Sequence, residues 1–291
     1  MSPASPSGFA VLRGRLFAWL QYVMPQHALS RLVLKATRVR RPWFKDALIS
    51  GFLQLFEVDM QDAVEPDPRR YASFNEFFTR ALKSGTRPIA ADPGSIASPV
   101  DGAVSECGAI DGDRLLQAKG QYYTLADLLA GQPWARRFEG GSFATIYLAP
   151  FNYHRIHMPL RGRLEGTWYV PGRLFSVNTL TARFVPRLFA RNERIVTLFE
   201  TQAGAVALVM VGALNVGSMA TVWAGDIAPA ARRVVTQLPP SSLTLEKGAE
   251  LGRFNMGSTV ILLFEPQRAL WRTGLQSGVA VRLGEALGTL Q

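Results

Sequence analysis

Two of the three histidines in this 291-residue chain, His154 and His157, lie together in the segment APFNYHRIHMPL. An HxxH spacing suits a zinc site, but the chain has no other cluster of His or Cys, so a carboxylate would have to complete the ligand set. A histidine pair can also bind loop backbone, and an imidazole with a pKa near neutral pH can act as a general acid or base. The two residues alone leave these three alternatives open.

Two other side chains could take part in catalysis. Asp101 stands in SPVDGAV, where an aspartate before a glycine is a common turn former. Ser258 stands in NMGSTV, where a serine also suits a turn or the start of a strand, and where the GxSxG pattern of an esterase nucleophile is missing. Taken singly, each residue has an ordinary structural explanation.

The composition and motifs argue against a disordered chain, a disulfide-bonded protein and a nucleotide-binding protein. With 48% hydrophobic residues, the chain is apolar enough and long enough to form a real core. Its one cysteine, Cys107, cannot form an internal disulfide, which favours a reducing compartment. Neither a GxGxxG nor a GxxxxGK[ST] loop is present, so a bound nucleotide is not indicated.

The hydrophobic pattern predicts an α+β protein whose core is mostly β. Ser73 followed by Glu76 forms a capping box for a helix, and a second short helix is expected at 124–130, ended by Gly131. The uncharged stretch 201–225 is as long as a membrane-spanning helix, but its glycines and its short Val-rich groups favour two buried strands joined by a turn. Further strands are expected at 143–149, 195–200, 259–265 and 279–283.

Basic residues are concentrated near the N-terminus. Residues 1–60 contain eight Lys or Arg and three Asp or Glu, which is half of the net charge of +10. The same region carries RLFAWLQYVM, RLVLKATRV and PWFKDALISGFLQLFEV, in which apolar and aromatic residues recur at helical spacing among cations. Such helices are too short and too charged to span a bilayer; they suit its interface or a place on the protein's own surface. The first dozen residues lack the pattern of a signal peptide.

In their order along the chain, the motifs resemble the phosphatidylserine decarboxylase proenzymes of the bacterial and mitochondrial type. The resemblance covers about residues 42–285 and is carried by FNEFFTRALKSGTRPI, SPVDGAV, FNYHRIHMPLRG, YVPGRLFSVN, LFARNERIV, VGSMATVWAG and GRFNMGSTVILLFE. Met256 stands where the family's usual motif has leucine, which is a volume-conserving apolar change. The resemblance implies a catalytic core at 61–291 behind amphipathic membrane-binding helices at 1–60.

The resemblance further implies that the chain cuts itself between Gly257 and Ser258. The serine hydroxyl would attack the preceding carbonyl, and Ser258 would become a covalent pyruvoyl group, so no dissociable cofactor and no metal are required. Gly257 is expected to supply φ freedom and to remove a side chain that would obstruct the attack. The products would be a β chain of 1–257 and an α chain of 258–291.

The resemblance also implies roles for the other site residues. Matched motif by motif, His157 is the base that activates Ser258, and Asp101 orients it. The substrate amine would form a Schiff base with the pyruvoyl group, which stabilises the carbanion left when carbon dioxide departs. His154 is expected to donate a proton to that carbon or to bind the departing carboxylate. Positions three apart on a strand face opposite sides, so both histidines can share one site only if the chain turns there.

By the same resemblance, the substrate is phosphatidylserine and the product phosphatidylethanolamine. The protein is then expected to lie on an anionic phospholipid surface, as a peripheral protein on the cytoplasmic face of the cell membrane. The two processed chains are expected to stay together as an αβ unit, and these units to pair as a homodimer. A lipid-binding homologue that does not cut itself is the main alternative. Nucleic-acid binding is a third, but no recognised reading motif supports it.

Overall fold

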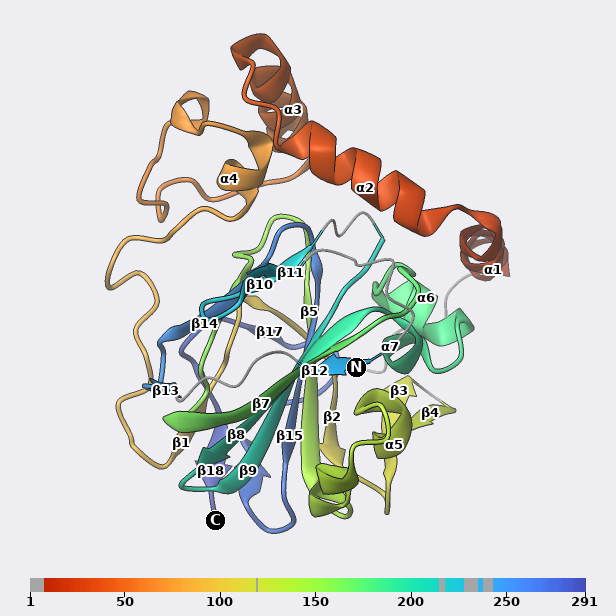
Figure 1. Ribbon diagram of the computed structural model, residues 1–291, viewed down its shortest axis with the longest axis vertical. Helices are drawn as coiled ribbons and strands as arrows, with labels where there is room; N and C mark the ends of the chain where they lie inside the picture. Colours follow the sequence, from red (N-terminus) through yellow and green to blue (C-terminus); the bar gives the residue numbers. More distant parts are fainter. Residues whose placement is uncertain (1–7, 119, 215–217, 228–234, 238–242) are drawn as a thin grey trace.

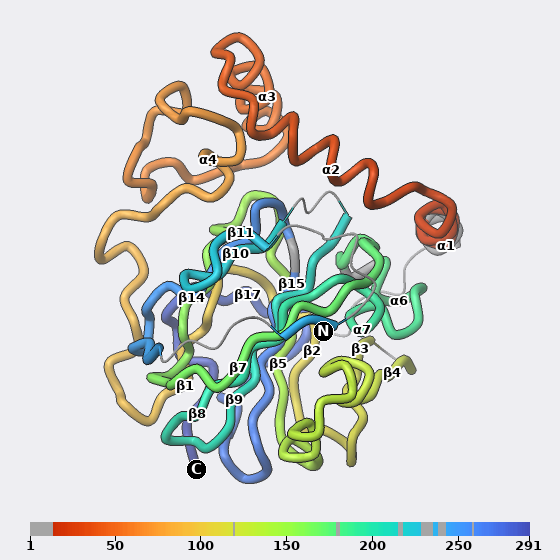
Figure 2. Tube along the Cα trace, in the orientation of Figure 1, coloured from red at the N-terminus to blue at the C-terminus, as the bar shows by residue number. Residues whose placement is uncertain are grey.

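A large antiparallel sheet forms the centre of the molecule, and a helical arm extends over one end of it (Figures 1 and 2). The computed structural model describes residues 8–118, 120–214, 218–227, 235–237 and 243–291. The helices are α1 (Gly8–Val23), α2 (Gln26–Thr37), α3 (Pro42–Leu55), α4 (Phe74–Phe78), α5 (Leu125–Leu128), α6 (Thr179–Phe184) and α7 (Leu188–Arg191), with 3-10 turns η1 (Pro68–Arg70) and η2 (Pro133–Phe138).

The strands that form the sheets come from residues 95–290. In spatial order, the large sheet contains β12 (Thr236–Gln237), β7 (Gly162–Val170), β8 (Arg194–Thr201), β9 (Gly204–Val211), β15 (Ser258–Phe264), β5 (Ser142–Leu148), β2 (Gly102–Ala109) and β17 (Ala280–Val281), with β13 (Thr244–Leu245) also paired to β7. A second sheet contains β11 (Gly225–Ile227), β10 (Met219–Thr221), β14 (Glu250–Phe254) and β6 (Arg155–His157). Smaller sheets join β1 (Ser95–Ala97), β18 (Ala286–Leu290) and β16 (Ala269–Trp271), and pair β3 (Arg114–Ala118) with β4 (Gln121–Thr124).

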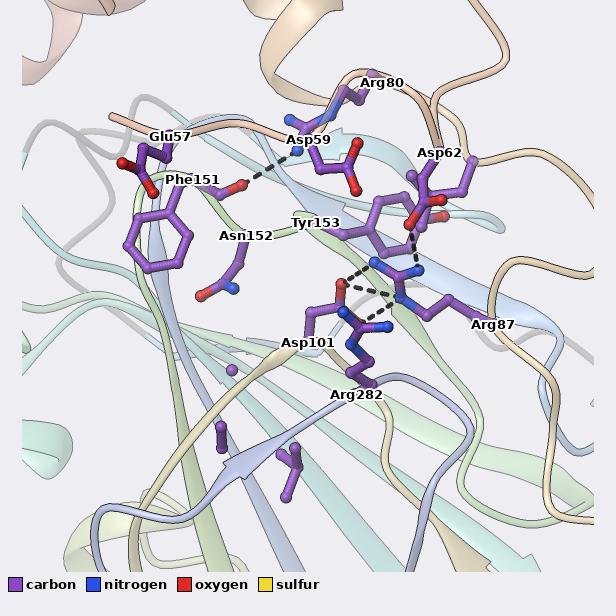
Figure 3. A pocket seen from close by; sticks show the side chains of 14 residues that line it. Glu57, Asp59, Asp62, Arg80, Arg87, Asp101, Phe151, Asn152, Tyr153 and Arg282 are labelled. Atoms are coloured by element: carbon purple, nitrogen blue, oxygen red, sulfur yellow. Dashed lines mark hydrogen bonds and ion pairs between the residues drawn. The ribbon is translucent and has the colours of Figure 1, made fainter. Parts of the chain in front are cut away.

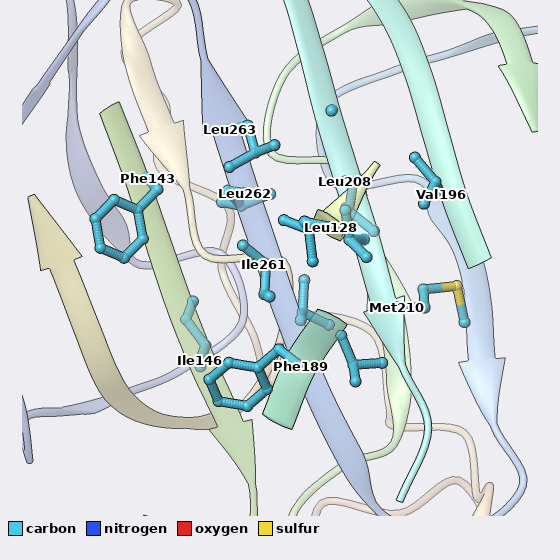
Figure 4. Packing of buried hydrophobic residues seen from close by; sticks show 14 of the residues in the cluster. Leu128, Phe143, Ile146, Phe189, Val196, Leu208, Met210, Ile261, Leu262 and Leu263 are labelled. Carbon is cyan, nitrogen blue, oxygen red and sulfur yellow. The ribbon is translucent and has the colours of Figure 1, made fainter. Parts of the chain in front are cut away.

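Strand β15 lies in the middle of the large sheet, between β9 and β5. Its residues 260–264 are fully buried, and Figure 4 shows Ile261 and Leu262 among apolar side chains of neighbouring elements. A strand buried on both faces has a continuous apolar sequence, which is why this segment has no alternating pattern. Ser258 begins the strand, and its backbone is in register with Leu148 of β5. The Gly257–Ser258 pair therefore stands at the entrance to a buried central strand.

The predicted α+β class is confirmed, and so is the strand at 259–265, which the structure has as β15. The stretch 201–225 does contain two strands, β9 and β10, but they do not pair with each other, and the expected turn between them falls partly on residues 215–217, which lie outside the described residues. β9 pairs with β8 and β15 in the large sheet, whereas β10 pairs with β11 and β14 in the second sheet. The tight turn lies earlier, between β8 and β9, where Gly204 has a φ of +76°.

Both expected helix starts are confirmed. The Ser73 side chain accepts a hydrogen bond from the Glu76 N–H at the start of α4, and the Glu76 carboxylate accepts one from the N–H of Ala72. At α5, the Thr124 side chain accepts from the Asp127 N–H, and the helix ends at Leu128, before the expected stop at Gly131.

The helical arm α1–α3 is attached to the core at defined points. The side-chain oxygens of Gln21 and Gln26, both buried, accept hydrogen bonds from the N–H groups of Ser176 and Leu174. At its other end α3 packs on α4, with the Phe52 ring against three phenylalanines. Among the described residues, no helix has the length and apolar character to span a bilayer. The domain boundary at residue 60 stays a prediction.

Candidate active site around Gly257

A three-residue connection, 255–257, links β14 to β15 and contains Gly257. Gly257 is not among the glycines with a positive φ, so φ freedom is not what the glycine supplies in this conformation. A Cβ at this position would lie 3.4 Å from His154 Nε2 and 3.8 Å from the Leu148 carbonyl oxygen, so it would contact the imidazole at an ordinary van der Waals distance rather than clash with it. The Ser258 side chain lies outside the described part of the structure.

His154, just before β6, is fully buried beside Gly257, and its ring centroid lies 4.1 Å from that of Phe78. Its Nδ1 donates to the carbonyl oxygen of Asn152 at 2.8 Å, so Nε2 carries the lone pair. Among the described residues, Nε2 has no hydrogen-bond partner. Burial lowers the pKa of His154 to about 3, although the bond to Asn152 acts in the opposite direction. The side chain is therefore a neutral acceptor beside the candidate cleavage bond.

His157, at the end of β6, has different surroundings. Its Nδ1 donates to the Gly248 carbonyl oxygen at 2.8 Å, and its Nε2 accepts from the Tyr153 hydroxyl at 3.0 Å. Burial is the main cause that lowers its pKa, while the bond to Gly248, the charge of Glu250 and, to the smallest extent, the charge of Asp101 act to raise it. Both ring nitrogens are thus occupied, in contrast to those of His154.

Asp101 is held by an arginine. The Arg87 guanidinium binds both carboxylate oxygens at 2.8–3.1 Å and also pairs with Asp62 at 2.7 Å (Figure 3). The N–H of Leu283 donates to Asp101 Oδ1 at 2.8 Å. These hydrogen bonds, first of all the one to Asp101, raise the pKa of Arg87. Between described residues no hydrogen bond joins the Asp101 carboxylate to His157, although the backbone N–H of His157 donates to the carbonyl of Pro99 nearby.

Two cavities flank the end of β5. One, of about 260 Å³, is mainly apolar, and Gly257 lines it together with Phe52 and Phe56 of the arm and Phe78 of α4. The other, of about 240 Å³, is lined by charged groups that include Asp101, as Figure 3 shows. The apolar cavity therefore borders the candidate cleavage bond, and the charged cavity borders the Asp101 carboxylate.

The structure thus places His154 beside Gly257. The link between His157 and Asp101 is indirect: the backbone N–H of His157 bonds to Pro99, and the charge of Asp101 acts on the pKa of His157. The zinc alternative required a third ligand, and no group of three or more His, Cys, Asp or Glu side chains occurs in the described ranges. Neither Arg87 nor Asn255 was predicted as a site residue from the sequence. Both stand inside motifs that carry the resemblance, so the signal was present, but their partners are distant in sequence.

Comparison with known families gives two matches. The model of the family described as Phosphatidylserine decarboxylase matches residues 74–289, and a second model, described as PSD, matches residues 16–57. The two matches fall on the sheet-rich core and on the helical arm, respectively.

Relatives match over nearly the whole chain. A phosphatidylserine decarboxylase proenzyme of Methylococcus capsulatus is 49% identical over 283 residues, covering 96% of this chain and 98% of the relative. A protein of the same name from Pseudomonas aeruginosa strain LESB58 is 51% identical over 280 residues, covering 94% and 97%. Another, from Pseudomonas fluorescens, is 50% identical over 282 residues, covering 95% and 98%.

Proposed function

The chain belongs to the phosphatidylserine decarboxylase family, and from that premise we propose that it converts phosphatidylserine and a proton to phosphatidylethanolamine and carbon dioxide. The proposal includes prior self-cleavage at the Gly257–Ser258 bond, called the scissile bond below. The observation that carries it is the Nε2 of His154, which lies beside Gly257 and has no hydrogen-bond partner among the described residues, where the entrance to a buried strand meets a cavity.

In self-cleavage the Ser258 hydroxyl attacks the Gly257 carbonyl carbon, the C–N bond breaks, and the peptide becomes an ester. Loss of the Cα proton of Ser258 then expels the Gly257 carboxylate and leaves dehydroalanine. Water hydrolyses this residue with release of ammonia, and the α chain then begins with a pyruvoyl group. This ketone supplies an electron sink for the decarboxylation when the substrate is bound. The Nε2 of His154, which is unpaired among the described residues, and the cavity that Gly257 lines fit such a group.

In this proposal His157 takes the proton of Ser258. The Gly248 carbonyl fixes the proton on Nδ1, so Nε2 is the acceptor. The charge of Asp101 favours the imidazolium that forms, and Arg87 holds that carboxylate in place. Because Nε2 accepts from the Tyr153 hydroxyl, this bond must be given up when His157 takes the serine proton.

His154 acts in the decarboxylation. With a pKa of about 3 it is neutral at pH 7 before the substrate binds, so it must take up a proton before it can give one to carbon. The negative charge of a bound substrate carboxylate would raise the pKa of this imidazole, so that Nε2 can accept a proton from the substrate ammonium group, which must be an amine before it can react with a ketone. The same proton is then available for the carbon that loses carbon dioxide, so His154 returns to its neutral form.

The two chains are expected to remain together after cleavage. Strand β15 belongs to the future α chain but lies between β9 and β5 of the future β chain, paired along its length with both. Removing it would expose a fully buried apolar strand to water. We further propose that the resulting αβ units pair as a homodimer, as the family resemblance implies.

The helical arm is proposed to bind an anionic membrane on its cytoplasmic face. Large apolar side chains are exposed along it: Leu16, Phe17, Trp19, Leu20, Tyr22, Val23, Leu32, Trp43 and Leu55. Basic residues interleave with them, which suits anionic headgroups. Since Phe52 and Phe56 of α3 also line the cavity beside Gly257, a lipid headgroup would reach the site along α3.

Activity is tested by incubating the purified protein with vesicles of phosphatidylserine and measuring phosphatidylethanolamine by mass spectrometry. Wild-type protein is expected to form product, and Ser258→Ala is expected to form none. Membrane binding is tested by flotation with the same vesicles. Trp19→Ser with Trp43→Ser is expected to weaken it, whereas Tyr122→Ser, an exposed aromatic of β4, is the matched control. Equal flotation of all variants would contradict the role of the arm.

A further inference from the structure

The connection that leads to the scissile bond is held through Asn255 by residues other than the two histidines. Asn255, two residues before Gly257, is fully buried. Its side-chain N–H groups donate to the Ser218 hydroxyl at 2.5 Å and to Asp226 Oδ1 at 3.3 Å. Its backbone N–H donates to the Ser218 carbonyl, and its own carbonyl accepts from the Asn75 side chain of α4. Asn255 is thus tied to three other segments.

Arg38, which follows α2 directly, binds the same two partners. Its Nη2 donates to Asp226 Oδ2 at 2.5 Å and to the Ser218 hydroxyl at 3.4 Å. Asp226 therefore uses one carboxylate oxygen for the arm and the other for Asn255. An arginine of the helical arm and an asparagine of the scissile connection meet on one aspartate.

Helix α2 is attached at its other end as well, where Gln26 accepts from the N–H of Leu174. A 12-residue helix is a rigid rod of about 18 Å, so its two ends move together. A displacement of the arm is therefore transmitted to Asp226 and Asn255. Gly257 is only two residues further on, within about 7 Å of chain.

We propose that Arg38, Asp226 and Asn255 form a clamp through which the docked arm positions the scissile bond, so that self-cleavage reaches its full rate only while α2 is docked. This rests on the self-cleavage proposed above. The three are positioning residues, since they act through the chain before Gly257. A misplacement of about 1 Å is enough to slow a reaction by about 100-fold.

The Arg38–Asp226 pair is suited to a test because its loss should leave the fold intact. The two side chains are 41% and 36% exposed, and exposed ion pairs add little to stability. The pair of Arg161 with Glu246, also exposed and outside the clamp, is a matched control.

The first experiment follows self-cleavage of proenzyme made by cell-free translation. Arg38→Ala and Asp226→Asn are each expected to slow the appearance of the α chain by about 10- to 100-fold. The double variant should be no slower than the slower single one, because both remove the same link. Arg38→Lys should be intermediate, since an ammonium keeps the positive charge on a side chain of different length and donor geometry. Arg161→Ala should cleave like wild type. Cleavage of Arg38→Ala at the wild-type rate would overturn the clamp.

The second experiment does not depend on cleavage. In the uncut Ser258→Ala chain, hydrogen exchange is measured in peptides that cover residues 250–257. Adding Arg38→Ala should accelerate exchange at Asn255, whose N–H bonds to Ser218, and Arg161→Ala should not. Unchanged exchange would overturn the clamp. Absence of cleavage in the wild-type chain would instead defeat the proposed function, while the exchange result still decides the clamp.

Discussion

The two histidines of the HRIH segment bind backbone carbonyls through Nδ1 in the same way, but their Nε2 atoms have different surroundings. His154 is fully buried among apolar groups, beside the scissile bond, with one nitrogen free among the described residues. His157 is half-buried, has both nitrogens occupied, and lies within the electrostatic reach of Asp101. Burial lowers the pKa of both imidazoles, but at His157 the bond to Gly248 and the charges of Glu250 and Asp101 oppose that effect. The surroundings, more than the spacing, decide which proton transfer each can perform.

Single replacement of each histidine should separate the two functions. His157→Ala should remain mostly uncut, with self-cleavage slower by about 10²- to 10⁴-fold, the usual contribution of a general base. His154→Ala should still be cut, but should decarboxylate phosphatidylserine about 10²- to 10⁴-fold more slowly. Denaturing gels report cleavage, and product formation on vesicles reports decarboxylation. The reverse assignment would follow if His154→Ala stayed uncut and His157→Ala was cut normally.

Arg87 holds the Asp101 carboxylate, whose charge acts on the pKa of His157. Arg87→Ala leaves the Asp101 carboxylate, whose side chain is 9% exposed, without its charged partner. Breaking a buried pair in this way costs about 3–5 kcal/mol of unfolding free energy. Urea unfolding in the uncut Ser258→Ala chain measures it, with Arg161→Ala as a control whose exposed pair should contribute less than about 1 kcal/mol. Equal losses in the two variants would show that the Asp101 site is not specially stabilised.

The burial of His154 should make the free energy of unfolding depend on pH. The pKa of His154 is lowered from 6.5 to about 3, so below pH 6.5 the unfolded chain binds a proton that the folded chain excludes. Stability contributed by neutral His154 is therefore present above pH 6.5 and is lost as the pH falls towards 3. The loss is about 1.4 kcal/mol per pH unit for one proton.

This slope is measured by urea unfolding between pH 7 and pH 4.5 in the uncut chain. His154→Gln should flatten it, because no titrating group then remains at that position. His157→Gln serves as the comparison and should flatten it less, since the bond to Gly248 and the charge of Asp101 oppose the effect of burial there. An unchanged slope in His154→Gln would contradict the account of a buried neutral imidazole.

The smallest expected effect is that of Tyr153→Phe. The variant removes the hydroxyl that occupies His157 Nε2, and a neutral hydrogen bond contributes about 1 kcal/mol, so self-cleavage should become faster by about fivefold at most. Time courses of newly made proenzyme measure this. A slowing of more than about tenfold would mean that the hydroxyl passes the proton to His157 instead of occupying it.

Local features of the fold were predictable from sequence, because their causes are local. The capped starts of α4 and α5 follow from residues three apart, and β15 follows from an uninterrupted apolar run. The assignment of β9 and β10 to different sheets was not predictable, since strand pairing joins segments that are distant in sequence. The same limit applies to the arm, whose contact through Arg38 spans 188 residues.

The candidate site was predictable in its members but not in their contacts. The motifs pointed to Asp101, His154, His157 and Gly257, and the structure places His154 beside Gly257. That Asp101 is bound by Arg87 and not by His157 depends on how two separate segments pack. The roles of the site residues therefore remain predictions that the replacements above decide.

The central claim is that the chain cuts itself at the Gly257–Ser258 bond and begins its α chain with a pyruvoyl group. The most direct measurement is the intact mass of the purified protein under denaturing conditions. We expect two chains that meet at this bond, with the smaller one lighter by one ammonia than a peptide that begins with serine. A single uncut chain after long incubation would contradict the claim and would favour a lipid-binding relative without this chemistry.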